Sequence, residues 1–165
     1  MSTPETSMRG KWPWLGLALA VLALDQITKY WAHSRLMLHE SIEVLPVFSI
    51  TLAYNTGAAF SFLADAGGWQ RWFLTLLAVG VSAVVVFWMA QARKAERGWL
   101  LCLSLILGGA LGNALDRALH GFVVDFLDLH YAGWHWPTFN VADMAIVLGA
   151  VLFVWFSLTT RDPAR

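Results

Sequence analysis

Four stretches of mainly apolar residues dominate this sequence, and each is near the length of a membrane-spanning helix. They cover about residues 12–31, 72–90, 98–115 and 141–160. A helix that crosses the hydrocarbon core of a bilayer needs about 20 such residues. Hydrophobic residues make up 58% of the chain and charged residues 13%, a balance typical of membrane proteins. We therefore predict an all-α membrane protein with four transmembrane helices in a single domain, residues 1–165.

The basic residues around these stretches predict how the helices are oriented, because Lys and Arg accumulate in cytoplasmic loops. Seven of them precede the first stretch, join the second to the third, or follow the fourth: Arg9, Lys11, Arg93, Lys94, Arg97, Arg161 and Arg165. Both termini are therefore expected in the cytoplasm, and segments 32–71 and 116–140 on the outer side. Residues 48–52 alternate apolar and polar, and with 42–44 they predict a small extracytoplasmic β-sheet between the first two helices.

Charge and cysteine content exclude several other classes of protein. The formal net charge is zero, from eleven residues of each sign, so no basic surface for nucleic acid is expected. The single cysteine, Cys102, can form no internal disulfide.

A cleaved signal peptide is an alternative interpretation of the first stretch, with Ala18 and Ala20 near a cleavage site. The apolar run continues to Trp31, which favours a retained helix.

Ionisable and amide side chains inside or beside the apolar stretches are the residues that indicate a site. Each ionisable group costs about 2.5 to 3.5 kcal/mol on membrane insertion, so it needs a partner or a purpose. Asp25 and Lys29, spaced i, i+4, predict either an ion pair whose lysine reaches the membrane surface or the wall of a polar site. Asn113 and Arg117 share a helix face, and with Asp116 they predict either an interfacial anchor or part of a site.

Asp125 and Asp143 have contrasting surroundings that suit a pair of catalytic acids. Asp125 lies in the apolar run GFVVDFL, and such a setting raises the pKa of a carboxyl group. Asp143 stands three residues after Asn140, which predicts a capping box at the start of the fourth helix and favours the ionised carboxylate. The third helix leads to the outer face and the fourth returns from it, so the two acids can meet. Two carboxyls that share a proton predict an aspartyl hydrolase site.

Other interpretations of the outer residues stay open at this stage. Asp128 lies close enough to Asp125 to compete for its role, although the neighbouring His130 favours a solvated position. His120, His130 and His135 could bind zinc with nearby aspartates, but no tight ligand spacing is present.

Two further functions are also compatible with parts of the sequence. A Ser–Lys hydrolase would use Lys29 with Ser49 or Ser61, and no nucleophile motif surrounds either serine. A small proton- or ion-coupled transporter subunit is the main non-enzymatic alternative, because paired intramembrane acids also mark proton relays. Relay acids should follow a path through the membrane, whereas these gather on the outer side.

Five strings carry a resemblance to a known family: DQITK at 25–29, YNTGAAFS at 54–61, GNALDR at 112–117, GFVVDF at 121–126 and FNVADMAI at 139–146. In these motifs, their order and the four-helix layout, nearly the whole chain resembles lipoprotein signal peptidase, also called signal peptidase II. The resemblance implies an aspartyl intramembrane endopeptidase of the bacterial cytoplasmic (inner) membrane. Such an enzyme removes the signal peptide from diacylglyceryl-modified prolipoproteins, cutting before the lipidated cysteine.

The same resemblance implies roles for individual residues. The catalytic pair would be Asp125 and Asp143. The supporting positions would be Asp25, Lys29, Asn55, Gly57, Asn113, Asp116, Arg117 and Asn140. It also implies that the small sheet cradles the substrate. No metal and no cofactor are expected, the partners are lipidated prolipoproteins and membrane lipids, and a monomer is expected.

Overall fold

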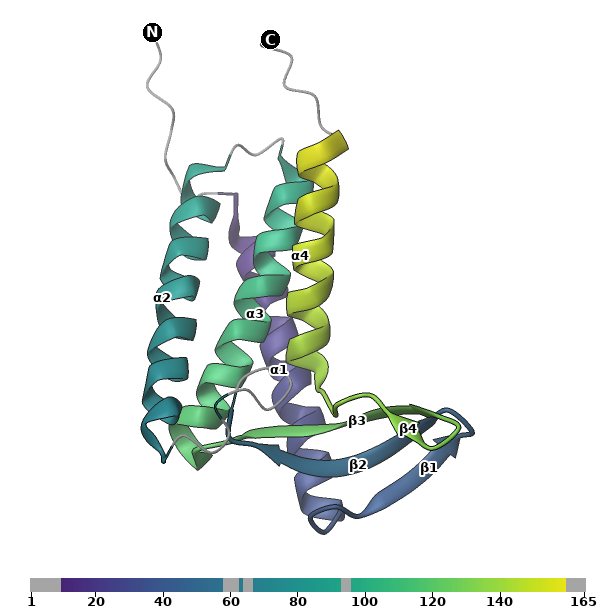
Figure 1. Ribbon diagram of the computed structural model, residues 1–165. Coiled ribbons are helices and arrows are strands. Elements are labelled where there is room, and N and C mark those ends of the chain that lie inside the picture. Colours follow the sequence, from purple (N-terminus) through teal and green to yellow (C-terminus); the bar gives the residue numbers. More distant parts are fainter. Residues whose placement is uncertain (1–9, 58–62, 64–66, 93–95, 160–165) are drawn as a thin grey trace, which may run out of the picture.

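The computed structural model of the protein describes residues 10–57, 63, 67–92 and 96–159. Within them the chain forms four long helices and four strands (Figure 1). In chain order these are α1 (Trp12–Arg35), β1 (Ser41–Leu45), β2 (Phe48–Asn55), α2 (Trp69–Gln91), α3 (Arg97–His120), β3 (Val123–Tyr131), β4 (Trp134–His135) and α4 (Val141–Thr159). The basic residues Arg9, Arg93, Lys94, Arg161 and Arg165, as well as Ser61 and most of the predicted loop at 54–62, lie outside the described residues.

Helices α1 and α3 are longer than their apolar stretches predicted, α1 by about one turn and α3 by nearly two. α3 ends where Gly121 adopts a φ of 88°, in the left-handed region that favours glycine, and the Gly121 N–H donates to the Arg117 carbonyl. The side chain of Arg71, on α2, donates to the carbonyls of Arg117 and Ala118. Because the backbone carbonyls at this end of α3 accept hydrogen bonds from protein donors, residues 116–120 continue the helix, although they were predicted to lie in the outer segment.

Three of the helices, α2, α3 and α4, are long and apolar enough to cross a membrane, judged on the described residues. α1 is equally long, but its C-terminal half contains Asp25, Gln26 and Lys29, and it does not meet the same standard of apolarity. The prediction of four apolar spans is therefore supported for three helices. Each of the three includes almost all of the stretch predicted for it, and the fourth long helix packs beside them.

α3 lies at the centre of the bundle and packs against all three other helices (Figure 1). Glycines on α3 allow close approach: a Cβ at Gly108 would lie 2.5 Å from the Ala18 carbonyl oxygen of α1 and 2.7 Å from Val21 Cβ. A Cβ at Gly109 would collide with the Ala142 carbonyl of α4. Small residues at such positions bring helix backbones close together, which is how membrane helices gain packing energy.

The four strands form one antiparallel sheet, in the order β1-β2-β3-β4, at one end of the bundle (Figure 1). The beginning of α1 and the end of α4 lie at the opposite end of the bundle. The predicted pairing of 42–44 with 48–52 is confirmed, since Ile42 lies opposite Ile50. The prediction that the sheet belongs only to the segment between the first two helices is wrong, because β3 and β4 come from the segment before α4.

β3 was not predicted because its sequence lacks the alternation of apolar and polar residues that is typical of a half-exposed strand. Its first four residues are all buried. A second apolar cluster explains the burial, since Val124 and Phe126 pack with Leu52 of β2 and with Ala32 and Leu36 at the end of α1. A short apolar run of this kind is compatible with a buried strand or with a helix segment, and its pairing with β2 spans about 70 residues of chain. The sheet is thereby fixed to α1, and Asp125 is placed on a buried strand.

The close helix contacts predict a stability difference between two glycine substitutions. Gly108→Ala should lower the free energy of unfolding by about 1 to 3 kcal/mol, because its Cβ meets the backbone of α1. Gly80→Ala is the matched control, since nothing lies within 4 Å of a Cβ there. Thermal unfolding in detergent, followed by circular dichroism, measures both. Equal melting temperatures for the two variants would contradict the packing described for α3.

Candidate active site

Asp125 and Asp143 come from different elements and meet around one asparagine. Asp125 lies on β3 and Asp143 in the first turn of α4, which Asn140 precedes. The Asn140 side-chain amide Nδ2 donates to Asp125 Oδ1 at 2.7 Å, and its backbone N–H donates to Asp143 Oδ2 at 3.3 Å. Asn140 is fully buried and Asp125 is 2% exposed. The two carboxyl groups are therefore held on either side of one buried residue, with Asp125 buried and Asp143 half-buried.

The start of α4 has the predicted capping box. Asn140 Oδ1 accepts a hydrogen bond from the Asp143 backbone N–H at 2.9 Å, while Asp143 Oδ2 accepts from the Asn140 N–H. This reciprocal pair satisfies two amide groups that a helix start leaves without partners. It also fixes the orientation of the Asn140 amide, because the oxygen faces a donor and the NH2 group must then face Asp125.

A second asparagine, Asn113 on α3, holds the other oxygen of Asp143. Asn113 Nδ2 donates to Asp143 Oδ1 at 2.7 Å. Asn113 Oδ1 accepts from Lys29 Nζ at 2.8 Å and from Asn140 Nδ2 at 3.2 Å. Since an ammonium group can only donate, the orientation of the Asn113 amide is also fixed. Both carboxylate oxygens of Asp143 thus receive N–H donors, an arrangement suited to an ionised carboxylate.

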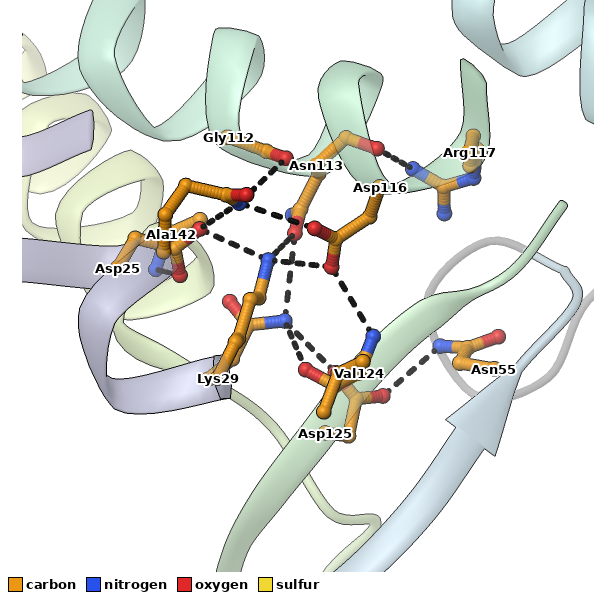
Figure 2. Close-up of polar contacts among 12 residues, drawn as sticks. Asp25, Lys29, Asn55, Gly112, Asn113, Asp116, Arg117, Val124, Asp125 and Ala142 are labelled. Atoms are coloured by element: carbon orange, nitrogen blue, oxygen red, sulfur yellow. Dashed lines mark hydrogen bonds and ion pairs between the residues drawn. The ribbon is translucent and has the colours of Figure 1, made fainter. Parts of the chain in front are cut away.

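Asp125 is in a different environment. Burial in the sheet, followed by the negative charge of Asp143, raises the pKa of Asp125 to about 7. Hydrogen bonds from Asn140 and Asn55, and the positive charge of Lys29, oppose that rise. Asn55 Nδ2, from the end of β2, donates to Asp125 Oδ2 at 3.2 Å (Figure 2). The carboxyl that the sequence placed in an apolar run therefore keeps its proton to a much higher pH than an ordinary aspartate does.

Lys29 lies inside this polar cluster and does not reach the membrane surface. It is 2% exposed, and its ammonium group forms ion pairs with Asp25 at 2.8 Å and with Asp116 at 3.0 Å (Figure 2). Its third hydrogen bond is the one to Asn113. The interpretation of Asp25 and Lys29 as a pair that reaches the surface is wrong. The alternative, the wall of a polar site, describes their position.

Arg117 is also buried, so the prediction of an interfacial anchor is wrong for this residue. Its Nη2 donates to the Gly57 carbonyl at 2.6 Å, and its Nη1 donates to the Asn113 backbone carbonyl at 3.5 Å. The Gly57 N–H in turn donates to Asn55 Oδ1 at 3.0 Å. Arg117 and Asn55 therefore hold the backbone at Gly57 from two directions, beside Asp125.

Asp128 belongs to a separate polar group at the far part of the sheet. It is 4% exposed, so the prediction of a solvated position is wrong. Its carboxylate accepts from Thr51 Oγ1 at 3.0 Å and lies 2.9 Å from His135 Nδ1. Asp128 lies opposite Ser49 in the sheet, whereas Asp125 lies opposite Ala53. Hydrogen-bonding partners within the sheet explain the burial, and the pattern of sequence neighbours could not reveal them.

Neither of the two other hydrolytic interpretations has its full set of residues assembled in the described part of the chain, although His130 and His135 stack on each other. In the described part of the chain, no group of three or more His, Cys, Asp and Glu side chains is arranged to hold a metal ion. Ser49 is buried and hydrogen-bonded to His130 Nε2 at 2.9 Å, while Lys29 bonds to Asp25, Asp116 and Asn113. The structure therefore does not join His120, His130 and His135 in a metal site, and Ser49 does not pair with Lys29.

One member of the cluster was not singled out from the sequence. Gln26 Nε2 donates to Asp116 Oδ1 at 2.9 Å, to Asp25 Oδ2 at 3.2 Å and to the Gly112 carbonyl at 3.3 Å. A glutamine next to an aspartate on a helix is typical of an exposed polar position. Its place inside the DQITK string was the one available signal.

Comparison with known proteins identifies relatives over most of the chain. The family model described as signal peptidase (SPase) II matches residues 17–159. The lipoprotein signal peptidase of Teredinibacter turnerae is 54% identical over 152 residues, covering 92% of this chain and 90% of that protein. The lipoprotein signal peptidase of Pseudomonas aeruginosa is 49% identical over 151 residues, covering 90% and 89%.

A solved structure has the same fold. It is described as a bacterial membrane enzyme determined by the in meso method at 2.3 Å resolution, and it matches with a TM-score of 0.81 and 29% identity, covering 93% of this chain and 94% of that one. None of these similarities supports the transporter alternative. Since the family model extends from within α1 to the end of α4, and relatives share about half of their residues with it, this chain belongs to the signal peptidase II family.

Proposed function

We propose that this protein is an aspartic endopeptidase of the inner membrane that removes signal peptides from diacylglyceryl-modified prolipoproteins, cutting before the lipidated cysteine. The observation that carries the proposal is the pair of carboxyls formed by the buried Asp125 and the half-buried Asp143, joined through Asn140 and held in different environments. Paired acids in which one holds a proton and the other does not are the requirement for aspartic hydrolysis. The names of the relatives supply the substrate class.

In the proposed mechanism Asp143 is the base and Asp125 is the acid. The ionised Asp143 takes a proton from a water molecule while the water oxygen attacks the scissile carbonyl carbon. The protonated Asp125 gives its proton to the carbonyl oxygen. The product of this step is a neutral tetrahedral diol. Asp143 then gives its proton to the leaving amide nitrogen, and Asp125 takes one back as the carbonyl reforms. Both carboxyls return to their starting states without a covalent intermediate.

The two asparagines support this assignment of base and acid. Both carboxyls accept two N–H donors, but Asp143 lies in the first turn of α4, where one donor is a backbone N–H and the helix dipole favours negative charge. Asp125 has a pKa near 7 and is readily protonated at neutral pH. A carboxyl with a pKa near the working pH is also the most efficient proton donor.

We further propose that α1 is a fourth membrane span and that the sheet lies on the outer side of the membrane. The outer half of α1 holds its polar residues against other helices, so Asp25 and Lys29 are not exposed to lipid. The acyl chains of the substrate would be held by burial among apolar surfaces, which keeps the peptide in register with the two aspartates. The enzyme would act as a monomer in contact with membrane lipids.

The proposed catalytic dyad, Asp125 and Asp143, predicts the loss of activity in two variants. Asp125→Asn and Asp143→Asn should each reduce cleavage of a diacylglyceryl-modified prolipoprotein by more than about 10³-fold, because each removes a proton transfer needed for bond cleavage. Gel-shift assays on purified protein in detergent measure this. A chelator such as EDTA should leave the wild type fully active, whereas a zinc enzyme would lose activity. Normal cleavage by either variant would eliminate the proposed dyad.

The pKa of Asp125 predicts the pH dependence of the reaction. Because the acid must be protonated, kcat should fall as the pH rises through about 7. Asn55 donates a hydrogen bond that favours the ionised carboxylate, so Asn55→Ala should raise the pKa of Asp125 further. The alkaline decline in kcat should then move to higher pH. A decline that stays in place or moves to lower pH in Asn55→Ala would contradict the assignment of Asp125 as the acid.

The proposed orientation can be tested with introduced cysteines. Glu43 lies on β1, where every residue is exposed, and Gln91 lies exposed at the end of α2. In right-side-out vesicles, a membrane-impermeant maleimide should label Glu43→Cys at once and Gln91→Cys only after permeabilisation. The native Cys102 is completely buried and should give no background signal. The reverse labelling pattern would refute the orientation.

A further inference from the structure

Two acids that do not contact the dyad hold the backbone beside each member of it. Asp25 Oδ1 accepts the Ala142 N–H at 2.8 Å, and Ala142 immediately precedes Asp143 (Figure 2). Asp116 Oδ2 accepts the Val124 N–H at 3.1 Å, and Val124 immediately precedes Asp125 (Figure 2). Each of the two acids is therefore attached, through its neighbour in the chain, to a carboxylate on a different element: Asp143 of α4 to Asp25 of α1, and Asp125 of β3 to Asp116 of α3.

The two anchoring carboxylates are themselves held together by two donors from one helix. Lys29 Nζ bridges Asp25 Oδ2 and Asp116 Oδ2. Gln26 Nε2 bridges the same two side chains, at 3.2 Å to Asp25 Oδ2 and 2.9 Å to Asp116 Oδ1. Asp25 is completely buried and Asp116 is 2% exposed. Two carboxylates this close repel each other, so their separation depends on the donors between them.

We propose that Gln26 is a positioning residue, which acts through Asp116 and Asp25 to set the separation of the two catalytic aspartates. The path runs from the Gln26 amide to two carboxylates, from each carboxylate to one backbone N–H, and from there to Asp143 and Asp125. This inference rests on the proposed function, since it assumes that the dyad is catalytic. It assigns Gln26 no contact with the substrate.

Lys29 alone does not make Gln26 redundant. The ammonium group contacts the Oδ2 atom of each anchoring acid, and Asp116 Oδ2 is also the atom that accepts the Val124 N–H. Gln26 is the residue that holds Asp116 Oδ1. Its donors therefore fix the rotation of the Asp116 carboxylate, which determines whether Oδ2 stays in line with the Val124 N–H.

The test compares Gln26→Leu with the wild type in purified, full-length protein. Leucine has a similar volume and no donor, so kcat should fall by about 5- to 50-fold while KM changes less than about threefold, since small displacements of catalytic groups reduce rate strongly. Ile27→Ala is the control, because Ile27 is 65% exposed on the same helix turn. It should keep wild-type kcat. Gln26→Met serves as a second variant where Gln26→Leu does not fold.

A double-variant comparison distinguishes positioning from a general loss of stability. If Gln26 acts through Asp116, adding Gln26→Leu to Asp116→Asn should reduce kcat little beyond the loss caused by Asp116→Asn alone. If the reductions in kcat caused by Gln26→Leu and Asp116→Asn multiply in the double variant, the proposal is wrong. It is also wrong if Gln26→Leu alone has normal kcat. Asp125→Asn measured in parallel separates the two hypotheses: normal cleavage by that variant refutes the proposed function, while an inactive Asp125→Asn beside a normal Gln26→Leu refutes the positioning role alone.

Discussion

The polar centre of this protein depends on the hydrogen bonds and ion pairs of one buried ammonium group, that of Lys29. It donates to Asp25, Asp116 and Asn113, and so uses all of its hydrogen atoms on buried acceptors from α1 and α3. Moving an ion out of water costs several kcal/mol, and such a cost is offset only where every charge has good partners. Removing Lys29 would leave two buried carboxylates together, at a cost of about 3 to 5 kcal/mol by analogy with other buried pairs. The packing of α1 against α3 is therefore strongly coupled to these contacts of Lys29.

The chemistry of the site follows from the same hydrogen bonds that hold the fold together. Lys29 can only donate, so it orients the Asn113 amide with its NH2 group toward Asp143. The capping box at α4 orients Asn140 with its NH2 group toward Asp125. In the proposed mechanism, helix initiation and catalysis therefore use the same side chains. This overlap means that the protonation of the two acids is determined by structural contacts rather than by added groups.

Much of this arrangement could be predicted from the sequence, and the failures have a common cause. The apolar stretches, the capping box at Asn140 and the strand at 48–52 are local patterns, and each was found. The position of β3, the burial of Asp128 and the role of Gln26 depend on partners far along the chain, such as Thr51 for Asp128. Local sequence also made Lys29 and Arg117 resemble residues at a membrane surface. Only the packing of α3 against its neighbours decides that they face inward.

In the proposed mechanism Asp125 is the acid that keeps a proton, and the charges of the cluster favour that role. Among the described residues around the dyad, Asp25, Asp116 and Asp143 contribute three negative charges, and Lys29 and Arg117 contribute two positive ones. Three minus two leaves one negative charge in excess before Asp125 is counted. Ionising Asp125 would double that excess inside a region with little water, which agrees with burial and Asp143 as the main causes of its raised pKa. A water molecule that loses its proton to Asp143 leaves the total charge unchanged, so the proposed reaction never requires a second excess charge.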